Sequence, residues 1–537
     1  MKKINILYII LFLLSIIINI FLDVYLLPNR LMKQDQVQHY YDMRKWYDSG
    51  KFPTTGARFV PSSNVSDEFT TPRVPGGAYY IFYILFYKLS SENLFVARVI
   101  NFLFNLVIIY IFLFWFYKKF GLIVLSFITP LILCNGYFVL AVTDFWNPSI
   151  ALIFSFLFFI FLFEYIDTEN EYNKRKNIVK ISAIFIFPII AIMSQGHFFT
   201  FLSTVPTIIL YLIIKYKRTL KYIVCWALGV FISFLLYVPY IISEIQNNFN
   251  NMNLALNIRE GFSSIPFPQI YAVLFYPTNE MSVFYGNRFS AIVYFWKNNP
   301  FMIIGLLFLF ITLLFSLFCF IRALYFTFNK NYQCKTNNEK VIINMIFVFL
   351  LFIVTTIVMN IVSRSKPAVV HYFYSVFSLS YLPIILFFIQ TVNIKKINYI
   401  LYSLILINMI IVALQLVVYT NNYEKPRNID AIKTVLNTIV KDAGENDFNI
   451  IEYGNHSDMF VDFASVYFTN INLNENNNST NIYLVFDKII SLSRNKDKVD
   501  KYMKYLEENS KLLIDNNAIF VRKINSDKIT NFKMPDF

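Results

Sequence analysis

Long apolar runs recur along this chain, and they constrain its fold more than any other feature of the sequence. Of its 537 residues, 57% are hydrophobic and 15% are charged, whereas soluble domains carry about 25% charged residues. A membrane-spanning helix needs about 20 apolar residues, but the strands of a membrane barrel alternate over about 10. The runs have the first length, so we expect an all-α polytopic membrane protein.

The apolar runs predict eleven spans. We place them at residues 4–22, 93–117, 120–140, 147–165, 178–194, 198–214, 220–241, 301–321, 341–361, 371–392 and 398–419. Residues 79–89 are apolar but too short to span, and we expect a surface or re-entrant helix there. The first run lacks a small-residue cleavage site and is therefore expected to be a retained span.

The distribution of positive charge orients these spans. The formal net charge is +14, but most basic residues outside the tail flank apolar runs, where they set topology. This placement argues against nucleic-acid binding. The short loops around Asp144 and Gln195 contain no Lys or Arg, which places them outside. An N-terminus inside and an odd number of spans place the C-terminus outside as well.

Two domains are expected from the polarity of the chain. Residues 1–419 form the membrane domain, with outer loops at 23–92 and 242–300. Residues 420–537 form a small soluble extracytoplasmic α/β domain. Within it the pattern predicts helices at 429–440, 461–468 and 499–513 and strands at 449–453, 481–486 and 518–521.

Polar side chains that could do chemistry gather on the outer side of this topology. Polar groups at membrane depth are costly and tend to mark sites, and several on one face weigh more than any one alone. The group comprises Asp35, Asp144, Arg364, Lys366 and the four histidines, His39, His197, His371 and His456.

Asp35 follows the first span and opens a segment with helical periodicity. Val37 and Tyr40 could lie on the bilayer while Asp42 faces water. An acid in this position could act as a general base toward an acceptor hydroxyl. It could equally be the N-cap of a surface helix, which spacing alone favours, and the two roles can coexist.

Basic residues stand at the outer ends of the later spans. Arg364, Lys366 and His371 could hold the phosphate of a leaving group, or they could anchor lipid headgroups and snorkel. These two interpretations are equally supported by the sequence. Arg98, slightly inside the second span, could snorkel or reach the same phosphate.

Motifs for several other chemistries are missing from the sequence. It contains no G-x-x-x-x-G-K-[ST] phosphate loop, no H-E-x-x-H zinc signature and no G-x-S-x-G elbow. A nucleotide sugar would lie on the wrong side of the membrane for the residues above. A lipid-linked donor is consistent with them.

The order of the outer motifs resembles the GT-C superfamily of integral-membrane glycosyltransferases, especially the bacterial branch related to protein mannosyltransferases and the aminoarabinose transferase. The resemblance covers about the first 215 residues. Two departures matter: Gly77 replaces a usual proline, and Gln36 stands where some relatives have a second acid, which weakens the case for a two-carboxylate or metal-bridged site. The matching motifs are Asp35-Gln36, Pro75-Gly76-Gly77, Ala97-Arg98, Trp146-Asn147-Pro148 and Gln195-Gly196-His197.

The resemblance implies an inverting transferase at the outer face of the bacterial cytoplasmic membrane. It would move a sugar from a polyprenyl-phosphate donor to an envelope glycan, lipid or protein, with Asp35 as general base. From the residues themselves we expect donor-phosphate contacts from the pool Arg98, Arg364, Lys366 and His371, and substrate contacts from His39, Tyr40, Trp146, Asn147, Gln195 and His197. A divalent metal is possible, with Asp35, Asp144 and Glu280 as candidate ligands that lack diagnostic spacing.

Three alternatives remain open from the sequence. A lipid-linked glycan flippase would need polar residues lining the spans at the midplane, and the predicted spans carry few. A polysaccharide polymerase or ligase would rely on basic and His residues of the large loop. A non-catalytic scaffold would tolerate the loss of any single outer polar residue.

Overall fold

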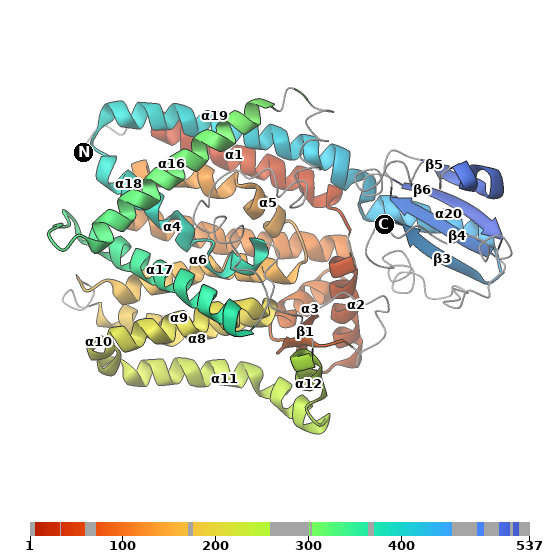
Figure 1. Cartoon of the computed structure of the whole chain (residues 1–537), viewed down its shortest axis with the longest axis horizontal. Helices are drawn as coiled ribbons and strands as arrows, with labels where there is room; N and C mark the ends of the chain where they lie inside the picture. The colour runs from red at the N-terminus through yellow and green to blue at the C-terminus, as the bar shows by residue number, and fades with distance from the viewer. Residues whose placement is uncertain are drawn as a thin grey trace.

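The computed structural model describes residues 6–32, 34–59, 71–169, 175–257, 300, 303–363, 370–453, 481–487, 504–515 and 519–525. In this part of the chain, apolar helices form one bundle, and a unit that contains a β-sheet stands at one end of it (Figure 1). The expected class, a helical polytopic membrane protein with a small α/β tail, is confirmed.

Eight of the described helices are long and apolar enough to cross a membrane. A helix of about 20 residues matches the thickness of the hydrocarbon core. They are α1 (Ile6–Asn29), α4 (Leu94–Leu133), α6 (Asn147–Ile166), α8 (Lys176–Gly196), α11 (Ile223–Gln246), α16 (Ile303–Phe328), α17 (Asn337–Ser363) and α19 (Lys395–Tyr419). Shorter connecting helices are α9 (Phe198–Ile214), α10 (Tyr216–Lys221) and α12 (Asn250–Asn257).

The second and third predicted spans are joined in α4. This helix has 40 residues, which is about 60 Å and twice the hydrocarbon thickness. It changes direction at Gly121, whose φ of 79° is accessible mainly to glycine. A break at Cys134 then leads into the short helix α5 (Gly136–Val142).

The predicted regular helix over residues 371–392 is wrong in its first half. The chain forms the 3₁₀ turns η2 (Val370–Val376) and η3 (Leu379–Tyr381), and the α-helix α18 (Leu382–Thr391) begins only afterwards. Pro383 lies in the first turn of α18. A proline is well accommodated in a first helical turn, where its missing N–H would be unpaired anyway, so Pro383 favours a helix start here.

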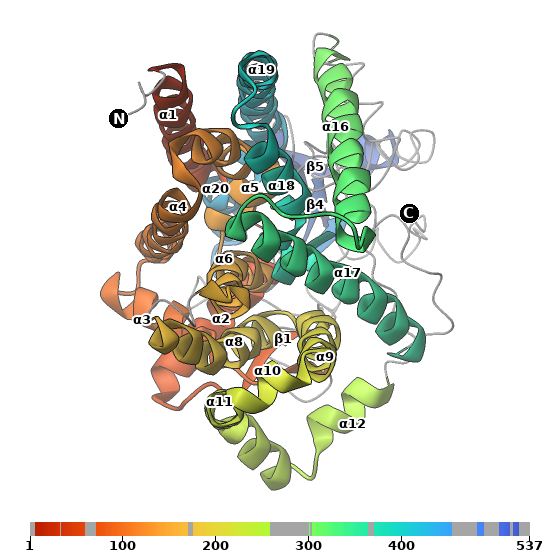
Figure 2. The same cartoon turned by 90° about the vertical axis from the view of Figure 1, so that its left-hand side faces the viewer.

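Helix α6 forms the centre of the bundle, as Figure 2 shows, and its neighbours include α4, α8 and α17. Its Phe156, Phe159 and Phe163 are fully buried, as expected for a helix that is apolar on all sides. Exposed Ile, Leu and Phe side chains lie on α1, α11 and α16 at the periphery, where lipid would meet them.

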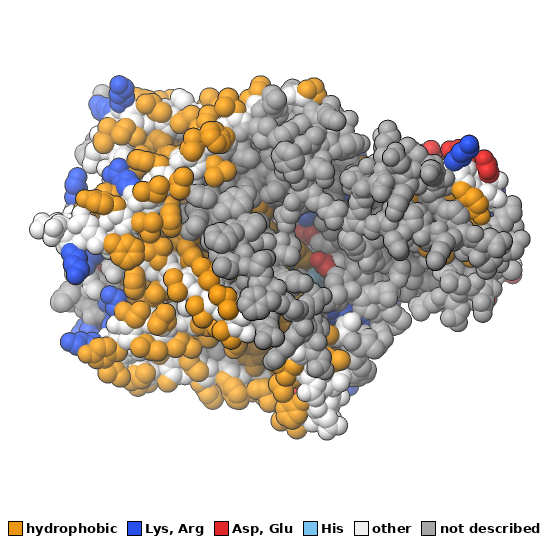
Figure 3. All heavy atoms as spheres, viewed as in Figure 1, with side chains coloured by type: hydrophobic (Ala, Val, Ile, Leu, Met, Phe, Trp, Pro, Cys, Tyr) orange, Lys and Arg blue, Asp and Glu red, His pale blue; other side chains and the backbone are white. Residues whose placement is uncertain are grey.

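The two ends of the bundle differ in charge. The N-terminus and the tail lie at opposite ends in Figure 1. Lys and Arg side chains gather at the N-terminal end in Figure 3, next to a broad hydrophobic band. A concentration of positive charge at one end is the pattern that orients membrane proteins.

The first outer loop lies at the tail-facing end of the bundle. It contains α2 (Gln34–Ser49), the antiparallel pair β1 (Thr55–Arg58) and β2 (Arg73–Pro75), and α3 (Tyr80–Leu89). The short helix expected at 79–89 is confirmed as α3. The helix expected from Asp35 is confirmed as α2, and Asp35 lies inside its first turn.

In the tail, α20 (Ile429–Ala443) precedes a four-stranded sheet of order β3-β4-β6-β5. β3 (Phe448–Tyr453) runs parallel to β4 (Asn481–Asp487), and β6 (Ile519–Asn525) is antiparallel to β4 and β5 (Lys511–Asp515). The predicted strands at 449–453, 481–486 and 518–521 and the helix at 429–440 match α20 and these strands. The helix predicted over 499–513 is wrong at its end, because β5 begins at Lys511, and the helix predicted at 461–468 lies outside the described residues.

The tail is tied to the outer end of α1 by backbone contacts. The Met32 N–H donates to the Arg427 carbonyl at 3.1 Å, and Leu31 and Asn428 form an antiparallel bridge. Two short helical turns, η4 (Thr420–Glu424) and η5 (Lys425–Arg427), bring the chain from α19 to this point. The start of the tail is therefore packed beside the segment that leads into α2.

The glycines after β2 are required by close packing against the end of α8. Gly76 has φ of +84°, and a Cβ there would lie 2.5 Å from Cδ of Gln195. Gln195 is fully buried, and its Oε1 accepts from the Ala78 N–H at 2.6 Å. The Pro-Gly-Gly segment and the Gln-Gly-His segment, far apart in sequence, thus form one interlocked corner.

We expect Gly76→Ala to lower the melting temperature more than Gly50→Ala. Both glycines have positive φ, so both variants carry backbone strain of about 1–2 kcal/mol. A Cβ added at Gly50 would meet no described atom within 4 Å, whereas one added at Gly76 meets Gln195, so only Gly76→Ala adds a steric overlap. Thermal unfolding in detergent measures the difference, and equal melting temperatures would show that the corner can relax.

Candidate functional site

Asp35 and Trp146 form the contact around which the candidate site is built. The Trp146 Nε1–H donates to Asp35 Oδ2 at 3.2 Å, and both side chains are half-buried. Trp146 is the extended residue just before α6, and Asn147-Pro148 opens that helix. Proline suits the first turn of a helix because its fixed φ is preorganised there. Pro148 therefore favours a helix that begins at Asn147 and leaves Trp146 just outside it.

Two histidines extend this contact into a continuous group. The Trp146 and His371 rings have centroids 4.8 Å apart, those of His371 and His197 5.2 Å, and those of His197 and Tyr372 4.8 Å. All of these rings are half-buried. We call Asp35, Trp146, His197 and His371 the outer cluster. They come from four different segments of the chain, and acidic and histidine side chains are visible in a hollow at the centre of Figure 3.

Beneath the outer cluster, His39 fixes the start of α6. The Asn147 N–H donates to His39 Nε2 at 3.2 Å, and His39 Nδ1 lies 2.9 Å from the Tyr80 hydroxyl oxygen. Asn147 Nδ2 in turn donates to the Gly196 carbonyl at 2.7 Å. His39 is only 2% exposed. Together, the hydrogen bonds of His39 and Asn147 fix the positions of α2, α6 and α8 relative to one another.

The chain of hydrogen bonds continues to a buried ion pair. The Tyr80 hydroxyl donates to Asp42 Oδ2 at 3.0 Å. Arg73 donates to both Asp42 oxygens, from Nη1 to Oδ2 at 2.8 Å and from Nη2 to Oδ1 at 2.9 Å. Two parallel bonds of this kind are the strong geometry for arginine and carboxylate. They fasten the β1–β2 ribbon to α2.

Asp144 is the centre of a second buried network. It accepts from Arg30 Nη2 at 3.0 Å and from Gln36 Nε2 at 2.8 Å, and Arg98 Nη2 lies 4.0 Å from its other oxygen. Arg30 also pairs with Glu424 of η4. Gln36 is the neighbour of Asp35 in the first turn of α2. Its hydrogen bond to Asp144 therefore anchors that turn to the buried network.

We expect the buried His39 to make stability depend on pH. Burial lowers the pKa of His39 below its ordinary value of about 6.5. The unfolded chain therefore binds more protons than the folded chain below that value. The contribution is fully present above about pH 6.5 and is lost as pH falls toward the folded-state pKa. Unfolding measured between pH 7.5 and 5.0 should show a smaller slope in His39→Gln than in the wild type, and an unchanged slope would contradict the assignment.

The structure brings only some of the predicted site residues together. Asp35, Trp146, His197 and His371 meet in the outer cluster, with Asn147 and His39 directly beneath it. Gln195 is instead buried in the corner beside Gly76. The remaining predicted residues Arg364, Lys366, His456 and Glu280 lie outside the described residues.

Tyr40 of α2 and Arg98 of α4 lie away from the outer cluster. The Tyr40 ring packs edge-on against Tyr87 with centroids 6.0 Å apart. Arg98 is 2% exposed, and its closest charged group is Asp144. Both residues line a cavity that the outer cluster does not line. A donor-phosphate role for Arg98 stays a prediction, and a phosphate could reach it through that cavity.

Of the three candidate metal ligands, Asp35 and Asp144 lie in the described ranges, and neither belongs to a group of metal-ligating side chains there. No group of three or more His, Cys, Asp or Glu side chains that could hold a metal occurs among the described residues. Asp144 is already neutralised by Arg30, which is a poor setting for a cation ligand. The described residues alone therefore do not assemble a metal site.

Three charged residues of these networks have no assigned role in the sequence-based prediction: Arg30, Arg73 and Glu424. The expectation that Asp42 faces water is wrong, because its side chain is 1% exposed and pairs with Arg73. Arg30 and Glu424 are 394 positions apart, and no local pattern pairs them. The sequence does give one indication for Arg30 and Glu424. Each follows the end of an apolar run, where a charged side chain is either exposed at the surface or paired with an opposite charge.

Comparison with known proteins gives a likeness at the level of structure. No protein-family model matches the chain, and none of the curated proteins matches it. ArnT from Cupriavidus metallidurans in the apo state is similar with a TM-score of 0.47 and 12% identity, covering 96% of this chain and 98% of that one. The same protein bound to undecaprenyl phosphate gives 0.48 and 12%, covering 95% and 97%.

Proposed function

We propose that this protein is a membrane glycosyltransferase. It transfers a sugar from a polyprenyl-phosphate donor to an envelope glycan, lipid or protein at the outer face of a bacterial cytoplasmic membrane. The observation that carries the proposal is the outer cluster. A half-buried carboxylate, an indole and two imidazoles meet there, at the end of the bundle opposite the Lys- and Arg-rich end.

The proposed topology follows from the same charge asymmetry. The Lys- and Arg-rich end, which carries the N-terminus, faces the cytoplasm under the positive-inside rule. The outer cluster and the tail then lie outside, at the level where the headgroup of a lipid-linked donor meets water. A water-borne acceptor and a lipid-bound donor can both reach Asp35 from this level.

Asp35 acts as general base in the proposed reaction. It takes the proton of the acceptor hydroxyl, and the acceptor oxygen bonds to the anomeric carbon as the bond from that carbon to the phosphate oxygen breaks. This single displacement inverts the anomeric configuration and releases polyprenyl phosphate. The indole hydrogen bond from Trp146 orients the carboxylate.

The basic residues act on the leaving group. Negative charge grows on the phosphate as the glycosidic bond breaks, and preorganised donors there lower the barrier. His371, which contacts Trp146, is the best placed of the described candidates. Arg364 and Lys366 precede it in sequence and complete the proposed set. Trp146 and His197 would then contact the sugar between Asp35 and the phosphate, since aromatic rings stack well on sugar faces.

Deleting the gene and analysing the cell-surface glycans by mass spectrometry tests this proposal. We expect one sugar to disappear, and to return with the wild-type gene but not with Asp35→Asn. Asp48→Asn is the matched control, because Asp48 lies on the same helix and its side chain is 60% exposed, and it should restore the sugar. Restoration by Asp35→Asn at equal protein level would reduce Asp35 to a helix-terminal residue and favour the flippase, polymerase or scaffold alternatives.

A further inference from the structure

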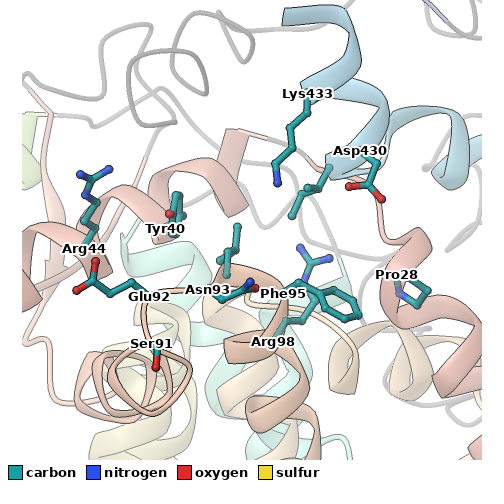
Figure 4. Close-up of a pocket in the computed structure, with 12 residues that line it drawn as sticks. Pro28, Tyr40, Arg44, Ser91, Glu92, Asn93, Phe95, Arg98, Asp430 and Lys433 are labelled. Atoms are coloured by element: carbon teal, nitrogen blue, oxygen red, sulfur yellow. The ribbon is translucent and has the colours of Figure 1, made fainter. Parts of the chain in front are cut away.

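A second cavity lies between the membrane helices and the tail. Its volume is about 580 Å³, within the usual range for small-molecule sites. The outer ends of α1 and α4, one face of α2 and the first turns of α20 line it (Figure 4). Pro28 and Phe95 on its rim are exposed at the ends of membrane helices, which places the opening at the level of lipid headgroups.

Arg98 in the wall of this cavity has too few acceptors. Its side chain is 2% exposed, yet no described group accepts from Nε. Its other contacts are long: Nη1 to the Leu27 carbonyl at 3.5 Å, and Nη2 to Met32 Sδ at 3.9 Å and to Asp144 Oδ1 at 4.0 Å. Ordinary N–H···O bonds measure about 2.7–3.2 Å. A buried guanidinium whose N–H groups lack close acceptors would be stabilised by an additional anion that accepts from them.

The side chains around Arg98 suit a singly charged anion that also carries hydroxyl groups. In Figure 4 the Lys433 ammonium comes down from α20 toward the Arg98 guanidinium, and Arg44 lies to one side on α2. Two acids, Glu92 and Asp430, also line the cavity. The lining thus holds three basic and two acidic side chains, and Arg44 also pairs with Asp48 at 3.6 Å, so Arg98 and Lys433 are the cations considered for the phosphate. Carboxylates cannot bind a phosphate oxygen, but they accept well from hydroxyl groups.

We propose that this cavity binds the phosphodiester headgroup of an outer-leaflet lipid whose headgroup carries hydroxyl groups. Arg98 and Lys433 hold the phosphate, since arginine suits phosphate oxygens geometrically. Glu92 and Asp430 hold the hydroxyl groups. The site goes beyond the proposed transfer reaction, because Asp35, Trp146, His197 and His371 do not line it. Its ligand would join the first helix of the tail to the membrane domain.

Native mass spectrometry of the full-length protein, delipidated in detergent and titrated with phosphatidylglycerol, tests this site. Loss of a charged phosphate contact should weaken binding about tenfold in Lys433→Gln, and Arg44→Gln should weaken it in the same direction. Lys441→Gln is the matched control. Lys441 lies on the same helix α20, is exposed and does not line the cavity, so its variant should bind as the wild type does.

Several results would overturn the proposal. Equal weakening in Lys441→Gln and Lys433→Gln would show only a general attraction of the tail for anionic lipid. Unchanged binding in both cavity variants would exclude the site. Phosphatidylcholine has the phosphate but no headgroup hydroxyl, and equally tight binding of it would refute recognition of hydroxyl groups. If inorganic phosphate bound as tightly and displaced phosphatidylglycerol, the site would take a free anion and not a lipid.

Discussion

Asp35→Asn is expected to lower the transfer rate by about 10²–10⁴-fold, the usual contribution of a general base, while the protein still binds its donor. Asparagine keeps the shape of the side chain and can still accept the Trp146 indole hydrogen bond. It cannot take a proton from the acceptor hydroxyl. The fold should survive, because Asp35 is half-buried and forms no ion pair among the described residues.

The measurement is kcat and KM with purified protein in lipid nanodiscs and the donor identified from the deletion strain. His371→Gln provides the contrast. A group that contacts the donor phosphate in the ground state should raise KM when it is removed, whereas loss of the base should lower kcat with KM little changed. If both variants changed KM alone, Asp35 would be a binding residue and the catalytic assignment would be wrong.

Arg73→Met is expected to cost about 3–5 kcal/mol of stability, the usual effect of removing one partner of a buried ion pair. Asp42 is 1% exposed and accepts two hydrogen bonds from Arg73, so the variant leaves a buried carboxylate without its cation. We expect a large fall in melting temperature, measured by size-exclusion chromatography after heating, and a low yield of folded protein.

Two further variants separate this effect from the mere loss of a charge. Arg44→Met removes an arginine from α2 whose pair with Asp48 is exposed, and such pairs contribute about 0.3–0.5 kcal/mol. Combining Asp42→Asn with Arg73→Met removes both buried charges, and the introduced amide can still accept from the Tyr80 hydroxyl. The double variant should therefore be more stable than Arg73→Met alone. If it were less stable, the pair would not be held by electrostatic compensation.

The sequence predicts the parts of this fold that depend on local pattern. Apolar runs and flanking charge locate α1, α6 and α8, because length and hydropathy alone decide whether a helix can span a membrane. The same rule does not predict that two spans are joined at Gly121 in one long helix. The hydropathy of an apolar run carries no information about the φ angle of a glycine inside it. Nor does it show that Pro383 begins an α-helix where a longer one would be expected, although the proline itself is visible.

The candidate site is predictable only in part, for a related reason. Asp35, Trp146, His197 and His371 share one side of the membrane, and topology alone suffices to collect them. The pairing of Arg30 with Glu424, or of Arg73 with Asp42, depends on how the outer loop folds back on itself. Gln195 shows the opposite error: its position at the outer end of a span suggests a ligand contact, but the neighbouring backbone encloses it.

The contact between the outer end of α1 and the start of the tail has a consequence for biosynthesis. Arg30 pairs with Glu424, and the Asn428 side chain donates to the Pro28 carbonyl 400 positions earlier. Membrane helices insert in order as the chain is made, so these contacts can form only after the last span has left the ribosome. The segment that leads from α1 into α2 thus gains these contacts last, although it is translated among the first. A chain interrupted before residue 424 would insert its spans without these contacts, and under the proposed function we expect such a truncated protein to be inactive.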